Sequence, residues 1–348
     1  MRVGIIGHFG YGENLINGQT IKTKIVTDVI VAQLGKNEVL KIDTHGGAKI
    51  LFKAPFQVIR AFWYSRNIII FPAHNGLRVY VPLMSIFRKF FKNRKIHYVV
   101  IGGWLPDFIK NKKLILMQLK KFNNIYVETN TMKKSLEEQG FKNIVVMPNC
   151  KNLNILKKDE LVYNFAEPLK LCTFSRVMNE KGISDAVDAV RRVNEKLQRI
   201  VYKLDIYGQV DEGQKEWFDN LQDGFPEYVK YCGVVPYDKS VDIIKNYFAL
   251  LFPTKFYTEG IPGTVIDAYA AGVPVIASKW ESFSDVIDDG ITGIGYEFSN
   301  LEELISLLMN ITSDHSIIET LKQNCIEKAE NYTLDRVAQI LRGGIVGI

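Results

Sequence analysis

Short runs of apolar, β-favouring residues alternate with longer stretches of mixed apolar and polar residues along the chain. Each run is apolar at nearly every position, which is typical of strands buried on both faces of a parallel sheet with helices between them. Twelve runs are predicted to be strands: 3–6, 39–42, 67–71, 97–101, 124–127, 144–147, 169–174, 203–207, 229–232, 249–252, 274–277 and 293–298. Six strands in each half predict an α/β protein with two doubly wound, Rossmann-like domains.

The boundary between the two predicted domains is a charged segment without clear periodicity, 151–167 (KNLNILKKDELVYNFAE), which is predicted to be a linker. It separates an N-terminal domain, 1–150, from a C-terminal domain, 168–331. The closing stretch, 332–348, is predicted to form an amphipathic helix that crosses back to the N-terminal domain.

The totals are those of an ordinary soluble protein: 348 residues, 47% hydrophobic and 24% charged. The four cysteines are far apart and form no C-x-x-C pair, which argues against a disulfide framework and a zinc site and suits a reducing cytoplasm. The N-terminal apolar run is too short for a signal peptide, and no run approaches the roughly 18 apolar residues of a spanning helix. A cytoplasmic protein is expected.

Charge is divided unevenly between the two halves. Residues 1–167 contain 26 Lys and Arg against 11 Asp and Glu, whereas residues 168–348 contain 18 against 27. Such an asymmetry predicts that the N-terminal half faces an anionic partner.

Candidate chemistry is concentrated where predicted strands end. In FPTKFYTEGIPGTVIDAYAAGVPVIAS (252–278), a strand is followed by Glu259, a Gly-Pro-Gly cluster, a short helix with Asp267 on its second turn, and another strand. A helix N-terminus at this edge of a parallel sheet favours phosphate, and carboxylates accept hydrogen bonds from the diols of a sugar or ribose. The alternative is that Glu259 is a solvated loop residue and Asp267 a surface helix residue.

A second strand end, LKLCTFSRVMNEKG (169–182), carries Arg176 and Lys181 before a helix. A guanidinium and an ammonium at a helix N-terminus can neutralise a diphosphate leaving group without a metal ion. The alternative is that both are solvated loop residues.

Taken in order, these segments resemble the retaining glycosyltransferases of family 4. The resemblance rests on Arg176 followed by Glu-Lys-Gly, and then on E-G-x6-D-A-x3-G-x-P-V-I from Glu259 onward. Further matching segments are IYGQ (206–209), YCGVV (231–235), VIDDGITGIGY (286–296) and NTMKKSLEEQGFKNIVVMPNC (130–150). The resemblance covers most of the chain and implies the GT-B fold, in which two Rossmann-like domains face each other across a cleft.

The resemblance also implies roles for individual residues. Arg176 and Lys181 would contact the diphosphate of a nucleotide-sugar donor, and Glu259 would hold hydroxyls of the donor sugar. The other residues implied in donor binding are Gly18, Gly208, Gly233, Gly260, Ile261, Pro262, Gly263, Thr264, Val265 and Asp267.

Two departures from the family pattern stand out. Asp267 occupies the position where the family usually has a ribose-binding glutamate, so its reach is one methylene shorter. The histidine that many relatives carry after the strand at 97–101 is missing, and Gly102, Gly103 and Trp104 follow instead. The acceptor-side candidates are Asn17, Gln19, His74 and Trp104; either histidine at a strand end, His8 or His74, can instead be structural.

Searches for other motifs are negative. The chain contains no D-x-D, H-E-x-x-H or G-x-S-x-G, so no metal is expected. No cofactor is expected either, and the nucleotide diphosphate-sugar is a co-substrate. The basic, aromatic stretches 78–98 and 104–122 are predicted to contact a membrane surface, although a solvated helix face explains them too. No nucleic-acid-binding module accompanies them.

The sequence therefore predicts a hexosyltransferase that is metal-independent and retains configuration. It would move a hexose from a nucleotide diphosphate-sugar, with uridine favoured by the resemblance, to a lipid-linked oligosaccharide during surface polysaccharide assembly, at the inner face of the membrane. The alternatives are a non-catalytic nucleotide-sugar-binding subunit and a GT-B epimerase or phosphorylase.

Overall fold

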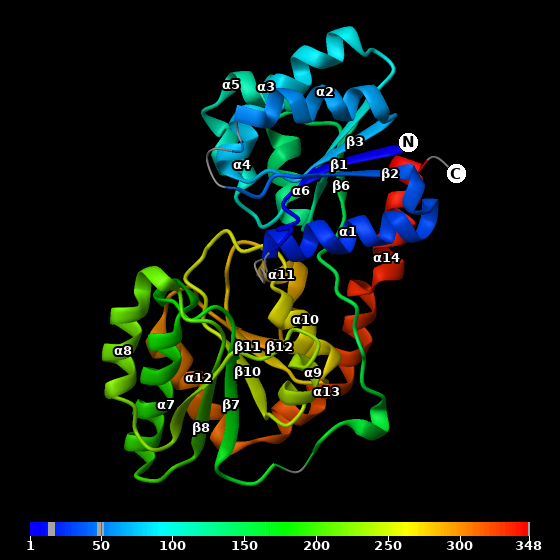
Figure 1. Cartoon of the computed structure of the whole chain (residues 1–348). Helices are drawn as coiled ribbons and strands as arrows, with labels where there is room; N and C mark the ends of the chain where they lie inside the picture. Colours follow the sequence, from blue (N-terminus) through cyan, green and yellow to red (C-terminus); the bar gives the residue numbers. More distant parts are fainter. Residues whose placement is uncertain (13–17, 47–49, 51, 164, 347–348) are drawn as a thin grey trace. The chain divides into compact units, whose positions relative to one another are not determined.

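The computed structural model describes residues 1–12, 18–46, 50, 52–163 and 165–346 (Figure 1). It divides into two compact units, Met1–Lys151 with Tyr332–Ile348, and Asn152–Asn331. The segment expected to be a linker, 151–167, thus lies almost entirely in the second unit. Within the described ranges, no helix combines the length and the apolar character needed to cross a bilayer.

The first unit is built on a six-stranded parallel sheet in the order β2-β1-β3-β4-β5-β6. Its strands are β1 (Val3–Gly7), β2 (Val39–Asp43), β3 (Asn67–Ile70), β4 (Lys95–Val99), β5 (Asn124–Val127) and β6 (Ile144–Val146). Its α-helices are α1 (Gly18–Leu34), α2 (Ala54–Tyr64), α3 (His74–Phe90), α4 (Leu105–Lys110), α5 (Lys113–Leu119), α6 (Asn130–Glu138) and α14 (Leu334–Leu341).

Successive residues of each strand in this sheet face different helices. Ile5 of β1 belongs to a buried core with Ile30 of α1 and Leu341 of α14, whereas its neighbour Ile6 packs in a core with Phe62 of α2. Because side chains alternate along a strand, helices must cover both faces of the sheet, which explains the uniformly apolar runs. The C-terminal helix α14 lies beside α1 and completes one of these layers (Figure 1).

The second unit has a parallel sheet in the order β12-β11-β10-β7-β8-β9. Its strands are β7 (Leu169–Phe174), β8 (Tyr202–Tyr207), β9 (Val229–Gly233), β10 (Ala249–Phe252), β11 (Val275–Ser278) and β12 (Gly293–Tyr296). Its α-helices are α7 (Ile183–Leu197), α8 (Lys215–Asp223), α9 (Ser240–Ile244), α10 (Gly263–Ala270), α11 (Phe283–Val286), α12 (Leu301–Ser313) and α13 (Ser316–Ala329). The predicted α/β class with two doubly wound sheets is confirmed.

The strand order of the second sheet reverses between β7 and β10. From β7 the chain moves outward through β8 and β9, then returns to the other side of β7 and moves outward through β10, β11 and β12. In open α/β sheets, the loops on either side of such a switch point diverge and leave room for a ligand at the carboxyl ends of the strands. The loops that follow β7 and β10 are therefore the expected ligand-binding loops of this unit.

Candidate functional site

The loops after β7 and β10 touch at Gly182. This residue has a left-handed backbone, with φ of 71°, and precedes the first residue of α7. A Cβ at this position would lie 1.8 Å from the carbonyl oxygen of Pro253, which follows β10. Only glycine fits both the backbone conformation and this close approach. Gly182 thus holds its neighbour Lys181 against the β10 loop.

Lys181 and Glu259 form an ion pair across these two loops. Their side chains are only 18% and 16% exposed, and Thr254 Oγ1 lies 3.4 Å from Glu259 Oε1. The Lys181 ammonium also lies 5.0 Å from the ring centroid of Phe256. Such burial contradicts the alternative in which the two charges are solvated loop residues, and the structure brings together two of the three predicted catalytic residues.

Arg176 lies apart from this pair and is more exposed. Its guanidinium Nη1 is 3.4 Å from Oδ2 of Asp211, and half of its side chain is accessible to solvent. The two cations predicted to contact one diphosphate therefore have different carboxylate partners in this structure.

Glycines bring the loops after β7, β8 and β9 into contact near Arg176. A Cβ at Gly208 would lie 1.7 Å from the carbonyl oxygen of Ser175, and Gly208 donates a 2.9 Å backbone hydrogen bond to Gly233. Gly233 has a left-handed backbone, and a Cβ there would meet no atom within 4 Å. The predicted donor-side glycines of this unit thus lie in adjoining loops at the carboxyl edge of the sheet.

The remaining predicted donor residues of this unit surround the start of α10. Pro262 caps the helix, and its carbonyl accepts hydrogen bonds from the backbone N–H groups of Val265 and Ile266. The N–H groups of Gly263 and Thr264, in the first turn, have no acceptor within the helix, so they are donors that a sugar or phosphate can use. Thr264 Oγ1 is buried without a hydrogen-bond partner in the described part of the chain.

Asp267 lies on the second turn of α10 and is only 4% exposed. This burial contradicts its alternative interpretation as a surface helix residue. Its predicted contact to ribose stays a prediction.

In the first unit, the acceptor-side candidates lie at the carboxyl ends of neighbouring strands. Gln19, in the first turn of α1, donates a 3.1 Å hydrogen bond to the carbonyl of Phe71 after β3, and Gly18 is an exposed residue at the start of the same helix. Asn17 lies outside the described residues. His74 begins α3, and its ring stacks on Trp104 with 3.8 Å between centroids.

Two carboxylates that organise these loops are not among the residues predicted from the sequence. Asp43, at the end of β2, accepts hydrogen bonds from the backbone N–H groups of Phe9, Tyr11 and His45 at 2.8, 3.0 and 2.9 Å. Burial raises the pKa of Asp43, but these backbone hydrogen bonds outweigh it and hold the pKa below its usual value. Asp211 is the second, as the partner of Arg176. The only sequence signal is their position after predicted strands.

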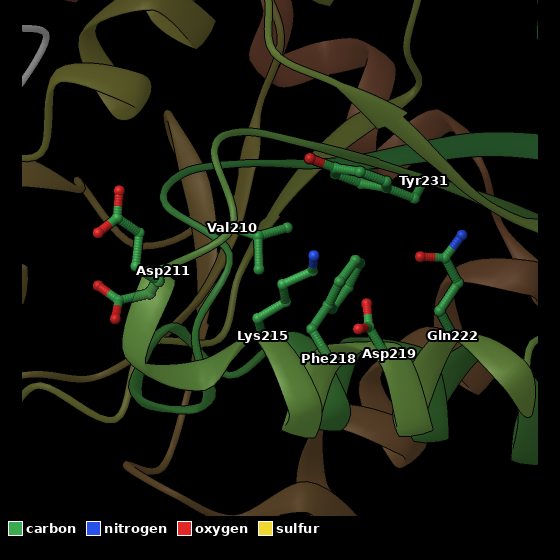
Figure 2. Close-up of a pocket in the computed structure, with 8 residues that line it drawn as sticks. Val210, Asp211, Lys215, Phe218, Asp219, Gln222 and Tyr231 are labelled. Atoms are coloured by element: carbon green, nitrogen blue, oxygen red, sulfur yellow. The ribbon is translucent and has the colours of Figure 1, made fainter.

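A separate pocket of about 260 Å³ adjoins the Arg176 side of the second unit (Figure 2). Two of its lining residues, Tyr231 and Phe218 of α8, are in edge-to-face contact, with 5.0 Å between ring centroids. Its lining residues are Val210, Asp211, Glu212, Lys215, Phe218, Asp219, Gln222 and Tyr231. None of the predicted site residues lines it, but Asp211 connects it to Arg176. Among the described residues, no group of three or more His, Cys, Asp or Glu side chains is arranged to hold a metal ion.

Comparison with known sequences gives matches that centre on the second unit. Residues 168–314 match the sequence model of "Glycosyl transferases group 1". One curated relative is the N,N'-diacetylbacillosaminyl-diphospho-undecaprenol alpha-1,3-N-acetylgalactosaminyltransferase of Campylobacter jejuni, 23% identical over 65% of this chain and 51% of that protein. Another is the amylovoran biosynthesis glycosyltransferase AmsK of Erwinia amylovora, 22% identical over 42% of this chain and 36% of that protein. The chain thus matches about half or less of the length of these relatives.

Solved structures agree on the fold. Anabaena Alr3699/HepE, crystallised in complex with UDP and glucose, superposes over 100% of both chains with a TM-score of 0.75 at 13% identity. Two six-stranded parallel sheets with this overall correspondence are the GT-B fold, as the resemblance implied.

Proposed function

We propose, from the match of residues 168–314 to the group 1 glycosyltransferase model, that this chain transfers a hexose from a UDP-sugar to a hydroxyl of a lipid-linked oligosaccharide. The reaction retains the configuration of the sugar and contributes to surface polysaccharide assembly. The donor binds to the second unit and the acceptor to the first.

The observation that carries this proposal is the Lys181–Glu259 ion pair at the switch point of the second sheet. A donor diphosphate brings negative charge to this point and attracts the ammonium of Lys181. The carboxylate of Glu259 is then available to accept hydrogen bonds from hydroxyls of the donor sugar. The N–H groups of Gly263 and Thr264, at the start of α10, complete a cradle for the sugar and phosphate.

The chemistry proposed for this site needs no nucleophile from the protein. The bond between the sugar C1 and the diphosphate oxygen breaks, and UDP departs with the electron pair. The acceptor hydroxyl forms the new bond on the same face, and its proton passes to the departing phosphate oxygen. Arg176 and Lys181 stabilise the charge that develops on the diphosphate, and each such preorganised group contributes roughly 2.7–4 kcal/mol. In this scheme the two side chains do the work that a metal ion does in other transferases.

The relatives support the choice of donor and acceptor. HepE was crystallised with UDP and glucose, and the Campylobacter jejuni relative is named for an acceptor carried on diphospho-undecaprenol. AmsK is named for the biosynthesis of a polysaccharide, amylovoran.

A surface of the first unit supports contact with an anionic membrane at the cytoplasmic face. Phe52, Phe56, Ile59 and Trp63, spaced at helical intervals before and along α2, are 85%, 75%, 40% and 66% exposed. We call these four residues the α2 stripe. An exposed apolar stripe flanked by basic side chains is typical of a helix that lies in a membrane interface. The neighbouring helix α3 ends in such a basic segment, with Arg88 and Lys89 in its last turn.

The proposal is tested with the purified chain and a panel of UDP-, dTDP-, GDP- and ADP-sugars. Binding is measured as a rise in melting temperature, because a ligand that binds only the folded state stabilises it. Turnover is measured as nucleoside diphosphate release with and without an undecaprenyl-diphosphate-linked saccharide. We expect UDP-sugars to bind, and release to depend on the acceptor. Binding without release would identify a non-catalytic nucleotide-sugar-binding subunit, and release of free sugar without acceptor would identify an epimerase.

A further inference from the structure

Three aromatic rings from the N-terminal ends of α3 and α4 lie together beside the carboxyl edge of the sheet of the first unit. The rings of His74 and Trp104 stack with 3.8 Å between centroids and 30° between planes. Phe108, on α4, lies edge-on to both, at 5.1 Å from His74 and 5.3 Å from Trp104. A hydrogen bond of 2.8 Å from Trp104 Nε1 to the carbonyl of Ile101 fixes the indole. We call the three rings the aromatic platform.

Two cations border the aromatic platform. Arg78, one turn along α3 from His74, lies with its guanidinium carbon 5.4 Å from the Phe108 centroid, and Lys112 Nζ lies 4.0 Å from it. Lys112 also donates a hydrogen bond to the carbonyl of Phe108. Within the described part of the chain, neither cation has a carboxylate partner. Their positive charge is therefore available to a ligand.

The same charges act on His74. Burial, followed by the charges of Arg78 and Lys112, holds the pKa of His74 below its usual value. The imidazole is therefore neutral at pH 7 and adds no third positive charge.

This combination selects a particular chemistry. Aromatic faces bind the apolar face of a sugar ring, while two unneutralised cations beside them bind an anion. His74 and Arg78 are exposed, and Trp104, Phe108 and Lys112 are partly exposed, so a ligand can reach them. A neutral sugar would leave the cations unused, and an isolated anion would leave the rings unused.

We propose that the aromatic platform with Arg78 and Lys112 is the subsite that binds the acceptor, which is a saccharide carrying an anionic group next to the sugar ring that stacks on Trp104. The inference deepens the proposed function and rests on it. The anion is either the diphosphate of a lipid carrier or a carboxylate of an acidic sugar. Both present the same chemistry to this surface.

The test measures binding of soluble probes to the full chain by calorimetry, with the donor site saturated by UDP. The probes are N-acetylglucosaminyl 1-diphosphate, glucuronic acid, N-acetylglucosamine and inorganic pyrophosphate. We expect one of the two anionic sugars to bind at least tenfold more tightly than the neutral sugar or pyrophosphate. A preference for the diphosphate sugar identifies a lipid-carrier acceptor, and a preference for glucuronic acid identifies an acidic saccharide. If pyrophosphate binds as tightly as the anionic sugars, the sugar ring makes no stacking contact, and the proposal is overturned.

Amino-acid substitutions test whether the probes bind at the aromatic platform. The affinity for the preferred probe should fall at least tenfold in the Trp104→Leu variant. It should fall by a similar factor in the double variant Arg78→Gln, Lys112→Gln. Trp104→Phe keeps a stacking face and should restore most of the affinity, which separates loss of stacking from loss of the loop structure. The matched controls are Trp63→Leu and a Lys110→Gln, Lys113→Gln pair, which alter an exposed tryptophan and two exposed lysines outside the platform. Equal losses in platform and control variants would overturn the proposal.

Failure of this inference can be told apart from failure of the proposed function. Trp104→Leu should leave UDP binding unchanged, whereas Lys181→Ala should weaken UDP binding without affecting the probe. If UDP binds and the platform variants do not change the affinity for the probe, the assignment of the acceptor subsite is wrong. The assignment of the donor site is then unaffected.

Discussion

Lys181 and Glu259 are 78 residues apart in the chain, yet they form a largely buried ion pair where the loops after β7 and β10 meet. The pair joins the two strands between which the strand order of the sheet reverses. The proposed catalytic chemistry depends on this relationship, because it places a cation and a carboxylate together at the expected ligand-binding point.

Replacement of either predicted diphosphate-binding cation should reduce turnover. Lys181→Ala and Arg176→Ala should each lower kcat by at least tenfold, and by about 10²–10³ if each contributes as a typical transition-state donor. Steady-state release of UDP in the presence of acceptor measures the effect. Lys196→Ala, which removes an exposed cation at the end of α7, is the control and should leave kcat unchanged. Near-normal rates in both site variants would refute the diphosphate assignment.

Gly182→Ala should destabilise the protein and lower activity together. The left-handed backbone alone costs an alanine roughly 1–2 kcal/mol. The added Cβ would also lie 1.8 Å from Pro253 O, so the β10 loop must move. Gly233→Ala is a matched control, because it has a similar left-handed backbone but an open space around the added Cβ. Urea unfolding should show a larger loss of unfolding free energy for Gly182→Ala than for Gly233→Ala. Equal losses would mean that the close approach to Pro253 does not affect stability.

Burial of Lys322 should make stability depend on pH. Its side chain is 1% exposed, and burial lowers its pKa to about 8 from an unfolded value of 10.5. Between these values the unfolded chain binds a proton that the folded chain does not, so the free energy of unfolding rises as pH increases through this window. At pH 7 the cost of burying the charge is fully present, at about 3 kcal/mol.

Lys322→Met should therefore raise the melting temperature at pH 7, and its advantage should shrink as pH approaches 10.5. Thermal unfolding at pH 7 and pH 10 measures this difference, with the exposed Lys196→Met as the control. A difference that does not change with pH would show that Lys322 is not held in the environment described.

The α2 stripe should govern membrane binding. Phe56→Glu with Trp63→Glu removes two exposed apolar side chains and adds negative charge, so co-sedimentation with vesicles containing anionic lipid should fall severalfold. Arg88→Glu with Lys89→Glu should have a similar effect that weakens at high salt. Val162→Glu, at an exposed apolar residue of the second unit, is the control. Unchanged vesicle binding in both double variants would exclude this surface.

The strands could be predicted from the sequence because buried strands of a parallel sheet are apolar at nearly every position. Each of the twelve predicted strands corresponds to a strand among the described residues, and the errors are confined to the strand ends. The strand predicted at 97–101 is β4, Lys95–Val99, since Lys95 pairs its backbone with Asn67 while its side chain stays exposed. A hydrophobic pattern reflects the burial of side chains and not the pairing of the backbone. It therefore cannot detect a strand end whose side chain is exposed.

The site could be predicted as a set of residues but not as a set of contacts. Lys181 and Glu259 each follow a predicted strand, but their pairing depends on the strand order, which no local pattern encodes. Asp43 and Asp211 were missed because a single aspartate after a strand is common. The partners that tie them to other loops, Phe9 and Arg176, are more than 30 residues away in the sequence. His74 and Trp104 were proposed separately, and their stacking depends on packing between two loops.

The most direct test of the central claim is a crystal structure of the chain grown with UDP. We predict electron density for the diphosphate within hydrogen-bond distance of Lys181, with Arg176 turned toward it and the first N–H groups of α10 donating to the nucleotide or to a bound sugar. A structure with UDP bound elsewhere, or with Lys181 still paired to Glu259 and no nucleotide at the switch point, would contradict the account.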